Sequence, residues 1–214
     1  MNAVRSVRFY GFRLLGAPVL RHGVFCLAER GSEAPVTFED ENNAAGVGGR
    51  KKVEIYTDGA CTGNPGPGGY GVILAYGDKR RELSAGYRRT TNNRMEIMAA
   101  IAGLEALKYP CDVTLYSDSQ YVVNSISKGW AKRWRANGWM RNKAEEAINP
   151  DLWQILLDLC DKHSVTFSWV RGHAGHAENE RCDRLSVAAA GGKDLLIDEG
   201  YERVSSRSGS GGRR

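Results

Sequence analysis

The chain has 214 residues, of which 42% are hydrophobic and 26% are charged, with 30 Lys and Arg against 25 Asp and Glu. These values are typical of one folded domain with short extensions, and no apolar run reaches the roughly 18 to 20 residues of a membrane-spanning helix. The five cysteines are odd in number and include no C-x-x-C pair, which argues against a secreted disulfide framework and favours a reducing compartment.

The positive charge is concentrated in a few segments. Residues 127–143 contain six basic side chains and no acid, and residues 202–214 contain four basic side chains against one acid. Outside residues 127–143, the stretch from 51 to 201 is acidic. A net charge of +5 is compatible with a polyanionic partner, and its distribution indicates which part of the chain would hold that partner.

Residues 1–50 show no sustained helical or strand period and end in a glycine-rich stretch, so we expect a disordered extension outside the fold. Four arginines precede the first acid, which leaves organellar import as an alternative to a cytoplasmic location. They are Arg5, Arg8, Arg13 and Arg21. Residues 202–214 are low in complexity and are expected to form a flexible basic tail. The predicted domain therefore spans residues 51–201.

The predicted elements of this domain follow one another in a mixed pattern. Alternating apolar residues predict a strand over 53–57, and strands over 70–76 and 82–87 flank the hairpin signal Gly77-Asp78. A helix capped by Asn92 or Asn93 ends before Pro110. Further elements are expected as a strand over 113–116, helices over 119–127 and 150–159, a strand over 165–170 and a helix over 178–190. Three consecutive antiparallel strands followed by alternating helices and strands predict an α/β fold with a mixed sheet flanked by helices.

Four carboxylates lie at the expected ends of these elements. Asp58 and Asp118 each follow a strand, Glu96 is placed in the first turn of its helix, and Asp183 in the last turn of another. If the two strands are neighbours, Asp58 and Asp118 lie close together, and such anions repel each other unless a cation lies between them. Taken singly, each of these acids is better explained as a helix-dipole partner or a turn cap.

The residues around the four acids carry a resemblance to a known family. The segments are TDGACTGNPGPGG (57–69), TTNNRME (90–96), YSDSQYV (116–122) and WVRGHAGHAENERCDRLSVAAA (169–190). In this order and spacing they resemble type 1 ribonuclease H in its bacterial-like form, ribonuclease HI, over about residues 51–201. The resemblance implies the ribonuclease H-like fold, with a five-stranded mixed sheet of three antiparallel strands followed by two parallel ones and helices on both faces. It also implies that Asp58, Glu96, Asp118 and Asp183 bind metal.

The chemistry expected of these acids is two-metal hydrolysis of a phosphodiester. Oxygen ligands suit Mg²⁺, with Mn²⁺ as a substitute, and two ions about 4 Å apart clamp a scissile phosphate. The resemblance implies that Asp58 bridges the ions, Asp183 joins it on the nucleophile side, and Glu96 and Asp118 hold the leaving-group side. It further implies that His173 assists proton transfer and product departure. The expected products carry 5′-phosphate and 3′-hydroxyl ends.

An alternative metal site uses the pairs Cys160-x-x-His163 and His173-x-x-His176, whose spacing superficially suits zinc. Cys160 falls on the apolar face of a predicted helix, where a free cysteine usually serves as a small buried hydrophobe. A predicted strand also separates the two pairs and would carry them to opposite ends of the sheet.

Short polar side chains near the acids are candidates for reading an RNA strand, because ribose hydroxyls distinguish RNA from DNA. Each of them also fits an ordinary turn or helix cap. The resemblance assigns to the RNA strand the backbone around Gly59 and Cys61 and the side chains of Asn64, Asn92, Asn93 and Gln120. It assigns to a pocket for a DNA-strand phosphate the residues Arg89, Thr91 and Asn149.

The acid-free segment interleaves basic side chains with three tryptophans. Some of the tryptophans must pack, because such large apolar side chains are rarely left fully exposed, and others can contact sugar. The resemblance implies a basic protrusion that grips the DNA strand with Trp130, Lys132, Arg133, Trp134, Arg135 and Trp139. The lysines and arginines among them would contact phosphates.

The sequence therefore predicts an endoribonuclease that hydrolyses the RNA strand of RNA–DNA hybrids. It is expected to be a monomer with no membrane association and no stable protein partner. Two alternatives stay open: a protein that binds hybrids without cutting them, and a nuclease of the same superfamily with another substrate. The presence of all four acids disfavours the first, and the tryptophan-rich basic segment with the asparagine cluster disfavours the second.

Overall fold

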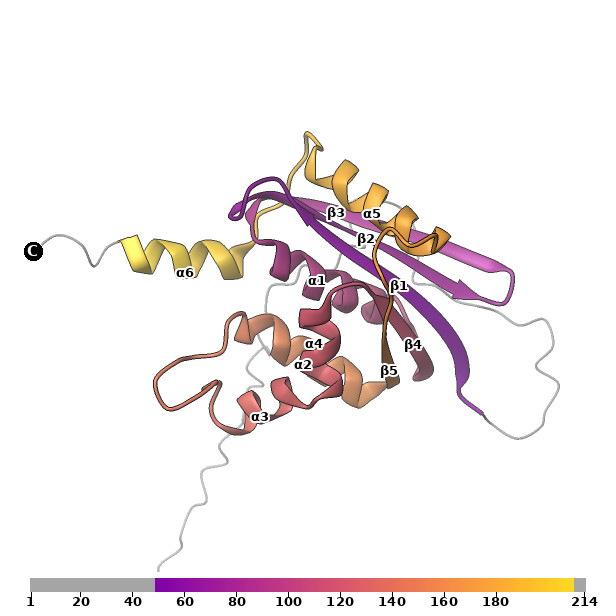
Figure 1. The fold of residues 1–214 in the computed structure, drawn as a ribbon, viewed down its shortest axis with the longest axis horizontal. Coiled ribbons are helices and arrows are strands. Elements are labelled where there is room, and N and C mark those ends of the chain that lie inside the picture. Colours follow the sequence, from indigo (N-terminus) through magenta and orange to yellow (C-terminus); the bar gives the residue numbers. More distant parts are fainter. Residues whose placement is uncertain (1–48, 210–214) are drawn as a thin grey trace, which may run out of the picture.

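A single five-stranded sheet organises the computed structural model, which describes residues 49–209 (Figure 1). The strands lie in the order β3-β2-β1-β4-β5. Antiparallel pairing joins the first three strands in sequence, and β4 and β5 extend the sheet in parallel from β1. This confirms the predicted mixed sheet. The strands are β1 (Lys51–Cys61), β2 (Gly66–Tyr76), β3 (Lys79–Thr90), β4 (Cys111–Ser117) and β5 (Ser164–Trp169).

Helices cover both faces of this sheet (Figure 1). α5 packs across β1, β2 and β3 on one face, while α1 packs on β1 and β2 from the other face and carries α4 on its outer side. Within residues 49–209, no helix combines the length and apolar character needed to cross a membrane. The helices are α1 (Asn92–Glu105), α2 (Gln120–Ser127), α3 (Trp130–Ala136), α4 (Pro150–Lys162), α5 (Ala177–Ala190) and α6 (Glu199–Gly209).

The main hydrophobic core lies between α1 and the sheet. In β1 the burial alternates, so that Val53 and Ile55 face this core while Lys52 and Glu54 are exposed on the other face. Apart from Arg94, the buried positions of α1 are apolar around nearly its whole circumference, because the helix is covered by the sheet on one side and by α4 on the other. A fully buried Trp153 on α4 closes the core.

Several predicted positions shift in the structure. β1 continues to Cys61, so Asp58 lies within the strand and not after it, because pairing with β2 continues through the glycine-rich segment. Thr91, and not Asn92 or Asn93, caps α1: its extended backbone lets Oγ1 accept a hydrogen bond from the Arg94 amide at 3.4 Å. Glu96 lies beyond the first turn of α1.

The predicted flexible tail is wrong for residues 202–209, which belong to α6. The Asp198 carboxylate accepts a hydrogen bond from the Tyr201 amide at 3.1 Å and so caps this helix. Arg88 on β3 donates two hydrogen bonds to Glu202, at 2.8 and 2.6 Å. Leu196 also pairs with β3, through backbone bonds to Gly86 and Arg88. The helix forms because the segment before it is fastened to the sheet edge. Residues 1–48 and 210–214 lie outside the described part.

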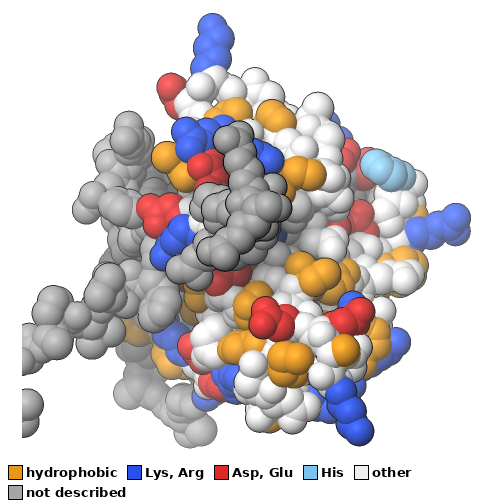
Figure 2. Space-filling view, turned by 90° about the vertical axis from the view of Figure 1, so that its left-hand side faces the viewer, with side chains coloured by type: hydrophobic (Ala, Val, Ile, Leu, Met, Phe, Trp, Pro, Cys, Tyr) orange, Lys and Arg blue, Asp and Glu red, His pale blue; other side chains and the backbone are white. Residues whose placement is uncertain are grey.

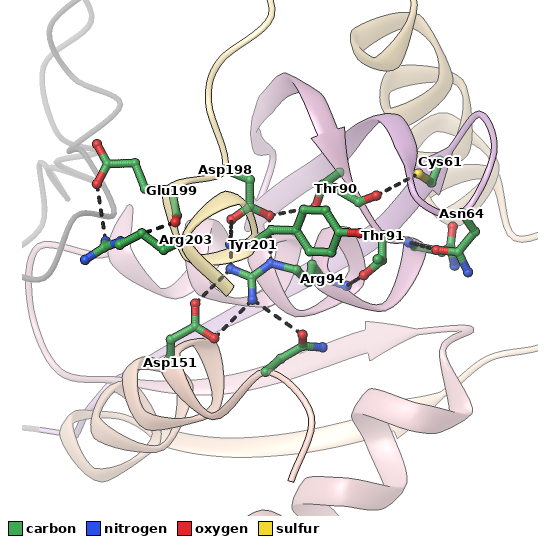
Figure 3. A network of polar contacts seen from close by, with 12 residues as sticks. Cys61, Asn64, Thr90, Thr91, Arg94, Asp151, Asp198, Glu199, Tyr201 and Arg203 are labelled. Atoms are coloured by element: carbon green, nitrogen blue, oxygen red, sulfur yellow. Dashed lines mark hydrogen bonds and ion pairs between the residues drawn. The ribbon is translucent and has the colours of Figure 1, made fainter. Parts of the chain in front are cut away.

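A buried ion network fastens the same region to α1 and α4 (Figure 3). The Arg94 guanidinium, only 3% exposed, donates to both carboxylate oxygens of the buried Asp198, at 2.6 and 2.8 Å. It also donates to Asp151 on α4, at 3.0 and 2.8 Å. Thr90 donates a further bond to Asp198 at 2.7 Å. A single arginine thus joins α1, α4 and the segment before α6.

Replacement of Arg94 by methionine should strongly destabilise the protein, because it leaves the buried Asp198 carboxylate without its cation. We expect Arg94→Met to lower the free energy of unfolding by about 3 to 5 kcal/mol in urea denaturation. Arg88→Met, which breaks an exposed ion pair to Glu202, is the matched control and should cost much less. Equal losses in the two variants would contradict this account.

Candidate active site

The sheet register places Asp58 beside Asp118. β1 and β4 run in parallel with Thr57 opposite Ser117. The residues that follow them, Asp58 and Asp118, therefore lie at the same end of the sheet. Asp118 directly follows β4, as predicted, and Asp58 continues β1. Both side chains are partly buried. The expectation that the two strands are neighbours is therefore confirmed.

Two glycines allow the helices to bring the other acids close. A Cβ atom on Gly59 would lie 2.4 Å from the backbone nitrogen of Glu96, so only glycine lets α1 approach β1 here. A Cβ atom on Gly71 would lie 2.2 Å from the carbonyl oxygen of Cys182, the residue before Asp183. Asp183 lies in the middle of α5 and not in its last turn as predicted. Close helix–sheet packing thus delivers Glu96 and Asp183 to the Asp58 end of the sheet.

The four acids influence one another electrostatically. Burial, with the negative charges of Asp118 and Asp183, raises the pKa of Asp58 from 3.8 to about 7 in spite of opposing hydrogen bonds from Gly59 and Ser186. Burial also raises the pKa of Glu96, and the charge of Asp118 adds to this effect against hydrogen bonds from Ser119 and Asn92. The acids therefore form one cluster of repelling carboxylates.

Each of three acids receives a hydrogen bond from a neutral side chain. Asn92 donates to Glu96 at 2.8 Å, and the Ser119 hydroxyl makes a short bond to the same carboxylate. The sequence reasoning did not find Ser119 or the two donors on α5, Asn179 and Ser186. The α5 donors lie four residues before and three residues after Asp183, so a polar stripe at helical spacing was the available signal.

The carboxylate cluster suits a hard divalent cation. Its ligands are all oxygen, and a cation placed among them would relieve the repulsion that raises the pKa of Asp58. As the side chains stand, no three His, Cys, Asp or Glu residues of the described part converge into a closed metal site. The four acids fit a divalent metal ion in charge and in ligand type. Their side chains would have to move closer together to bind it.

The loop before α5 brings His173 to the edge of the cluster. A Cβ atom on Gly172 would lie 2.7 Å from Oδ2 of Asp118, so this part of the loop lies against the acids. His173 follows it, is exposed, and has a left-handed backbone with φ of 53°. The side chain is thus next to the cluster without being packed into it.

The alternative zinc site is not assembled. His163 is buried at the start of β5, where its Nδ1 accepts a hydrogen bond from the Cys111 amide at 3.2 Å. His173 and His176 lie beyond the other end of the same strand. The two pairs therefore lie at opposite ends of β5 and cannot share an ion.

The residues expected to read RNA are partly linked to the acids. The backbone N–H of Asn92 donates to Oδ1 of Asn64 at 3.3 Å, and the side-chain amide of Asn92 donates to Glu96. Both asparagines are therefore fixed relative to one acid. Asn93 and Gln120 are exposed. The Cys61 thiol donates to the carbonyls of Gly66 and Thr90, both at 3.6 Å.

The residues expected to hold a DNA phosphate gather around Arg94. Thr91 caps the helix at the Arg94 amide (Figure 3). Oδ1 of Asn149 accepts a bond from the Arg94 guanidinium at 3.4 Å. Arg89 is exposed at the end of β3. Thr91 and Asn149 are therefore brought together by the buried ion network, with Arg89 on the nearby strand.

The tryptophan-rich segment forms α3 and a loop beside a hollow of about 460 Å³. Trp134 packs edge-on against Trp153 with ring centroids 6.0 Å apart, and Lys128 lies over the Trp130 ring. Trp139 is partly buried against the core. The residues that line the hollow are Tyr121, Trp130, Arg133, Trp134, Asn137, Arg141 and Ile148.

Arg135, which was expected to contact phosphate, has two acidic neighbours in the structure. Its guanidinium donates to Asp158 at 3.2 Å and to Asp161 at 3.4 Å, both on α4, because the helical turn directs it away from the hollow. Arg141 also has an acidic partner, Glu145. Lys132 and Arg133 are exposed. On the part of the face in Figure 2 that belongs to the described residues, basic, acidic and hydrophobic side chains are interspersed.

Comparisons with known proteins agree with this geometry. The family model for RNase H matches residues 50–191. A ribonuclease H of Syntrophus aciditrophicus is 70% identical over 152 residues, which is 71% of this chain and 88% of that protein. A ribonuclease HI of Synechocystis is 64% identical over 150 residues, covering 70% of this chain and 94% of the relative.

Solved structures give the same result for the fold. LC9-RNase H1, a type 1 RNase H with the type 2 active-site motif, has a TM-score of 0.61 at 35% identity, covering 77% of this chain and 85% of that one. LC11-RNase H1, solved in complex with RNA/DNA hybrid, has a TM-score of 0.51 at 25% identity and covers 65% of this chain and 96% of that one.

Burial of Asp58, together with repulsion from the neighbouring acids, should make the metal-free protein less stable as the pH rises. The folded-state pKa of Asp58 lies near 7, above the ordinary 3.8, so the folded chain holds a proton that the unfolded chain releases between these values. In EDTA, the titration of Asp58 should lower the free energy of unfolding by about 2 to 4 kcal/mol between pH 4 and pH 7. Urea denaturation at several pH values measures it.

Asp58→Asn should abolish this part of the pH dependence, so the variant should exceed the wild-type chain in stability at pH 8 and not at pH 4. Asp112→Asn, at the other end of β4, is the control and should keep the wild-type slope. If the stability of Asp58→Asn fell with pH as steeply as that of the wild-type chain, Asp58 would not be the group responsible.

Proposed function

Because the chain belongs to the type 1, bacterial-like ribonuclease H family, it is an endoribonuclease that acts on RNA–DNA hybrids, and we propose that its four clustered carboxylates hold the metal ions of the reaction. They are Asp58, Glu96, Asp118 and Asp183. The observation that carries the proposal is geometric: the parallel register of β1 and β4 and the close helix packing at Gly59 and Gly71 bring these acids to one end of the sheet. Anions held together in this way provide a site for cations.

We propose that the carboxylate cluster binds two Mg²⁺ ions, for which Mn²⁺ can substitute. When bound, such ions supply positive charge to the scissile phosphate and lower the pKa of the attacking water. Asp58 serves both ions from the centre of the cluster. Asp183, on α5, serves the nucleophile side, and Glu96 and Asp118 serve the leaving-group side. Hydrolysis on this plan leaves a 5′-phosphate and a 3′-hydroxyl.

His173 assists this chemistry from the edge of the cluster. It is exposed and follows Gly172, which lies against Asp118, so its imidazole is placed to exchange protons with the reacting phosphate and with solvent. Histidine is the side chain that most often transfers protons in enzyme active sites. In this role His173 promotes proton transfer and product departure and is not a metal ligand.

The RNA strand lies along the asparagine side of the cluster. The Asn92 side chain is hydrogen-bonded to Glu96, and Asn64 accepts a bond from the Asn92 backbone, so a ribose hydroxyl that they recognise is placed in register with the acids. Asn93 and Gln120 add exposed amide groups, and the backbone around Gly59 and Cys61 completes this surface. The hybrid in the LC11-RNase H1 complex supports a hybrid duplex as the substrate.

The DNA strand is held at two places. Arg89, Thr91 and Asn149 bind one phosphate near the Arg94 network. The α3 hollow binds the strand further along, where Trp130 and Trp134 offer ring surfaces to sugars and Lys132 and Arg133 reach phosphates. Trp139 supports this surface by packing. A monomer located in the cytoplasm is the accompanying proposal.

Cleavage specificity tests the proposed function directly. With Mg²⁺ present, the wild-type chain should cut labelled RNA–DNA hybrid in preference to double-stranded RNA and double-stranded DNA. Asp58→Asn should abolish cleavage while hybrid binding survives, because a central oxygen ligand is lost and the strand contacts are not. Asp112→Asn should behave like the wild-type chain. Binding without cleavage by the wild-type chain would instead identify a non-cutting hybrid-binding protein.

The salt dependence of hybrid binding tests the two neighbouring arginines of α3. Arg133→Gln should weaken binding and reduce the slope of log affinity against log salt by about one, as expected for one lost phosphate contact. Arg135→Gln is the matched control, because Arg135 is held by Asp158 and Asp161, and it should leave the slope unchanged. A reduced slope only in Arg135→Gln would reverse this assignment.

A further inference from the structure

One face of α5 carries three polar residues at helical spacing. Asn179, Asp183 and Ser186 lie at positions i, i+4 and i+7, so their side chains project from the same side of the helix. Asn179 is 2% exposed and Ser186 is fully buried. Buried polar side chains of this kind require partners, and the partners here are carboxylates from the sheet.

Asn179 holds Asp118. Its Nδ2 donates to Oδ2 of Asp118 at 3.3 Å, and Gly172 lies against the same oxygen from the loop. The Oδ1 atom of Asn179 is buried and has no hydrogen-bond partner among residues 49–209. The amide is therefore retained for the bond that it donates, because a buried oxygen without a partner carries a cost.

Ser186 holds Asp58. Its hydroxyl lies 3.3 Å from Oδ2 of Asp58 and 2.8 Å from the carbonyl oxygen of Asp183. A hydroxyl has one proton, so it donates to one of these acceptors at a time. Donation to Asp58 compensates part of the charge of a carboxylate that is buried beside two other acids.

We propose that Asn179 and Ser186 are positioning residues that set the Asp118 and Asp58 carboxylates for metal binding. The inference rests on the proposed function, in which these acids are metal ligands. Without the two donors, repulsion would turn the carboxylates away from each other, and metal binding would have to reverse that rotation. With them, α5 presents its own ligand Asp183 and orients both strand ligands from one rigid element.

Loss of either donor should weaken metal binding and leave hybrid contacts intact, because neither side chain faces the proposed strand surfaces. Ser186→Ala and Asn179→Ala should each raise the Kd for Mn²⁺ and for Mg²⁺ about tenfold in calorimetric titration of the free protein. Cleavage by both variants should need more Mg²⁺ for half-maximal rate, with an unchanged KM for hybrid at saturating Mg²⁺.

Ser125→Ala is the matched control. Ser125 is fully buried in α2, and its hydroxyl has no hydrogen-bond partner within residues 49–209. The control should keep the wild-type metal Kd, so a general effect of a buried serine-to-alanine change is separated from positioning. Thermal unfolding of each metal-free variant checks the fold, and Ser186→Ala, which removes one oxygen atom, carries the test if Asn179→Ala does not fold.

An unchanged metal Kd in folded Ser186→Ala, or an equal weakening in Ser125→Ala, would overturn the proposal. Failure of the proposed function has a different signature, since the wild-type chain itself would then bind no divalent metal or leave the hybrid uncut.

Discussion

The mutual repulsion of four acids is the constraint on which the rest of the structure depends. Asp58 and Asp118 are placed together by parallel pairing of β1 with β4, and Glu96 and Asp183 are brought in by helices on opposite faces of the sheet. Carboxylates separate spontaneously when they are free to do so. Their proximity must therefore be maintained by rigid elements, and the helix–sheet packing at Gly59 supplies that rigidity on the α1 side.

The buried ion network around Arg94 also stabilises the packing of α1 on the sheet, from the side of the helix that faces away from the acids. Arg94 precedes Glu96 by two residues on α1, so the two side chains leave the helix in different directions, one toward α4 and Asp198 and the other toward the acid cluster. The network fixes the rotation of α1 about its axis. It also joins Thr91 and Asn149, so the proposed phosphate pocket and the proposed metal site share one support.

Sequence patterns predicted those features that depend on local periodicity or on motifs. Alternation of apolar and polar residues predicted the first strand, the Gly77-Asp78 hairpin signal predicted the next two, and motif order singled out the four acids. The position of Arg135 could not be predicted this way, because its partners Asp158 and Asp161 come from a different helix and appear only when α3 packs on α4. The α6 helix was missed for the same reason: its composition is that of a flexible tail, and its order comes from Asp198 and Arg88 in the folded chain.

The tertiary ion pairs also change the meaning of the basic segment. Arg135 and Arg141 already have acidic partners, so the formal charge of residues 127–143 overstates the charge available to phosphates. The hollow beside α3 is lined by aromatic rings as well as arginines, and ring contacts to sugars do not depend on salt. Under the proposed function, binding of a nucleic acid at this hollow therefore relies more on shape and packing than the sequence indicates. The strand would approach an acidic centre, and metal ions held there would make that approach favourable.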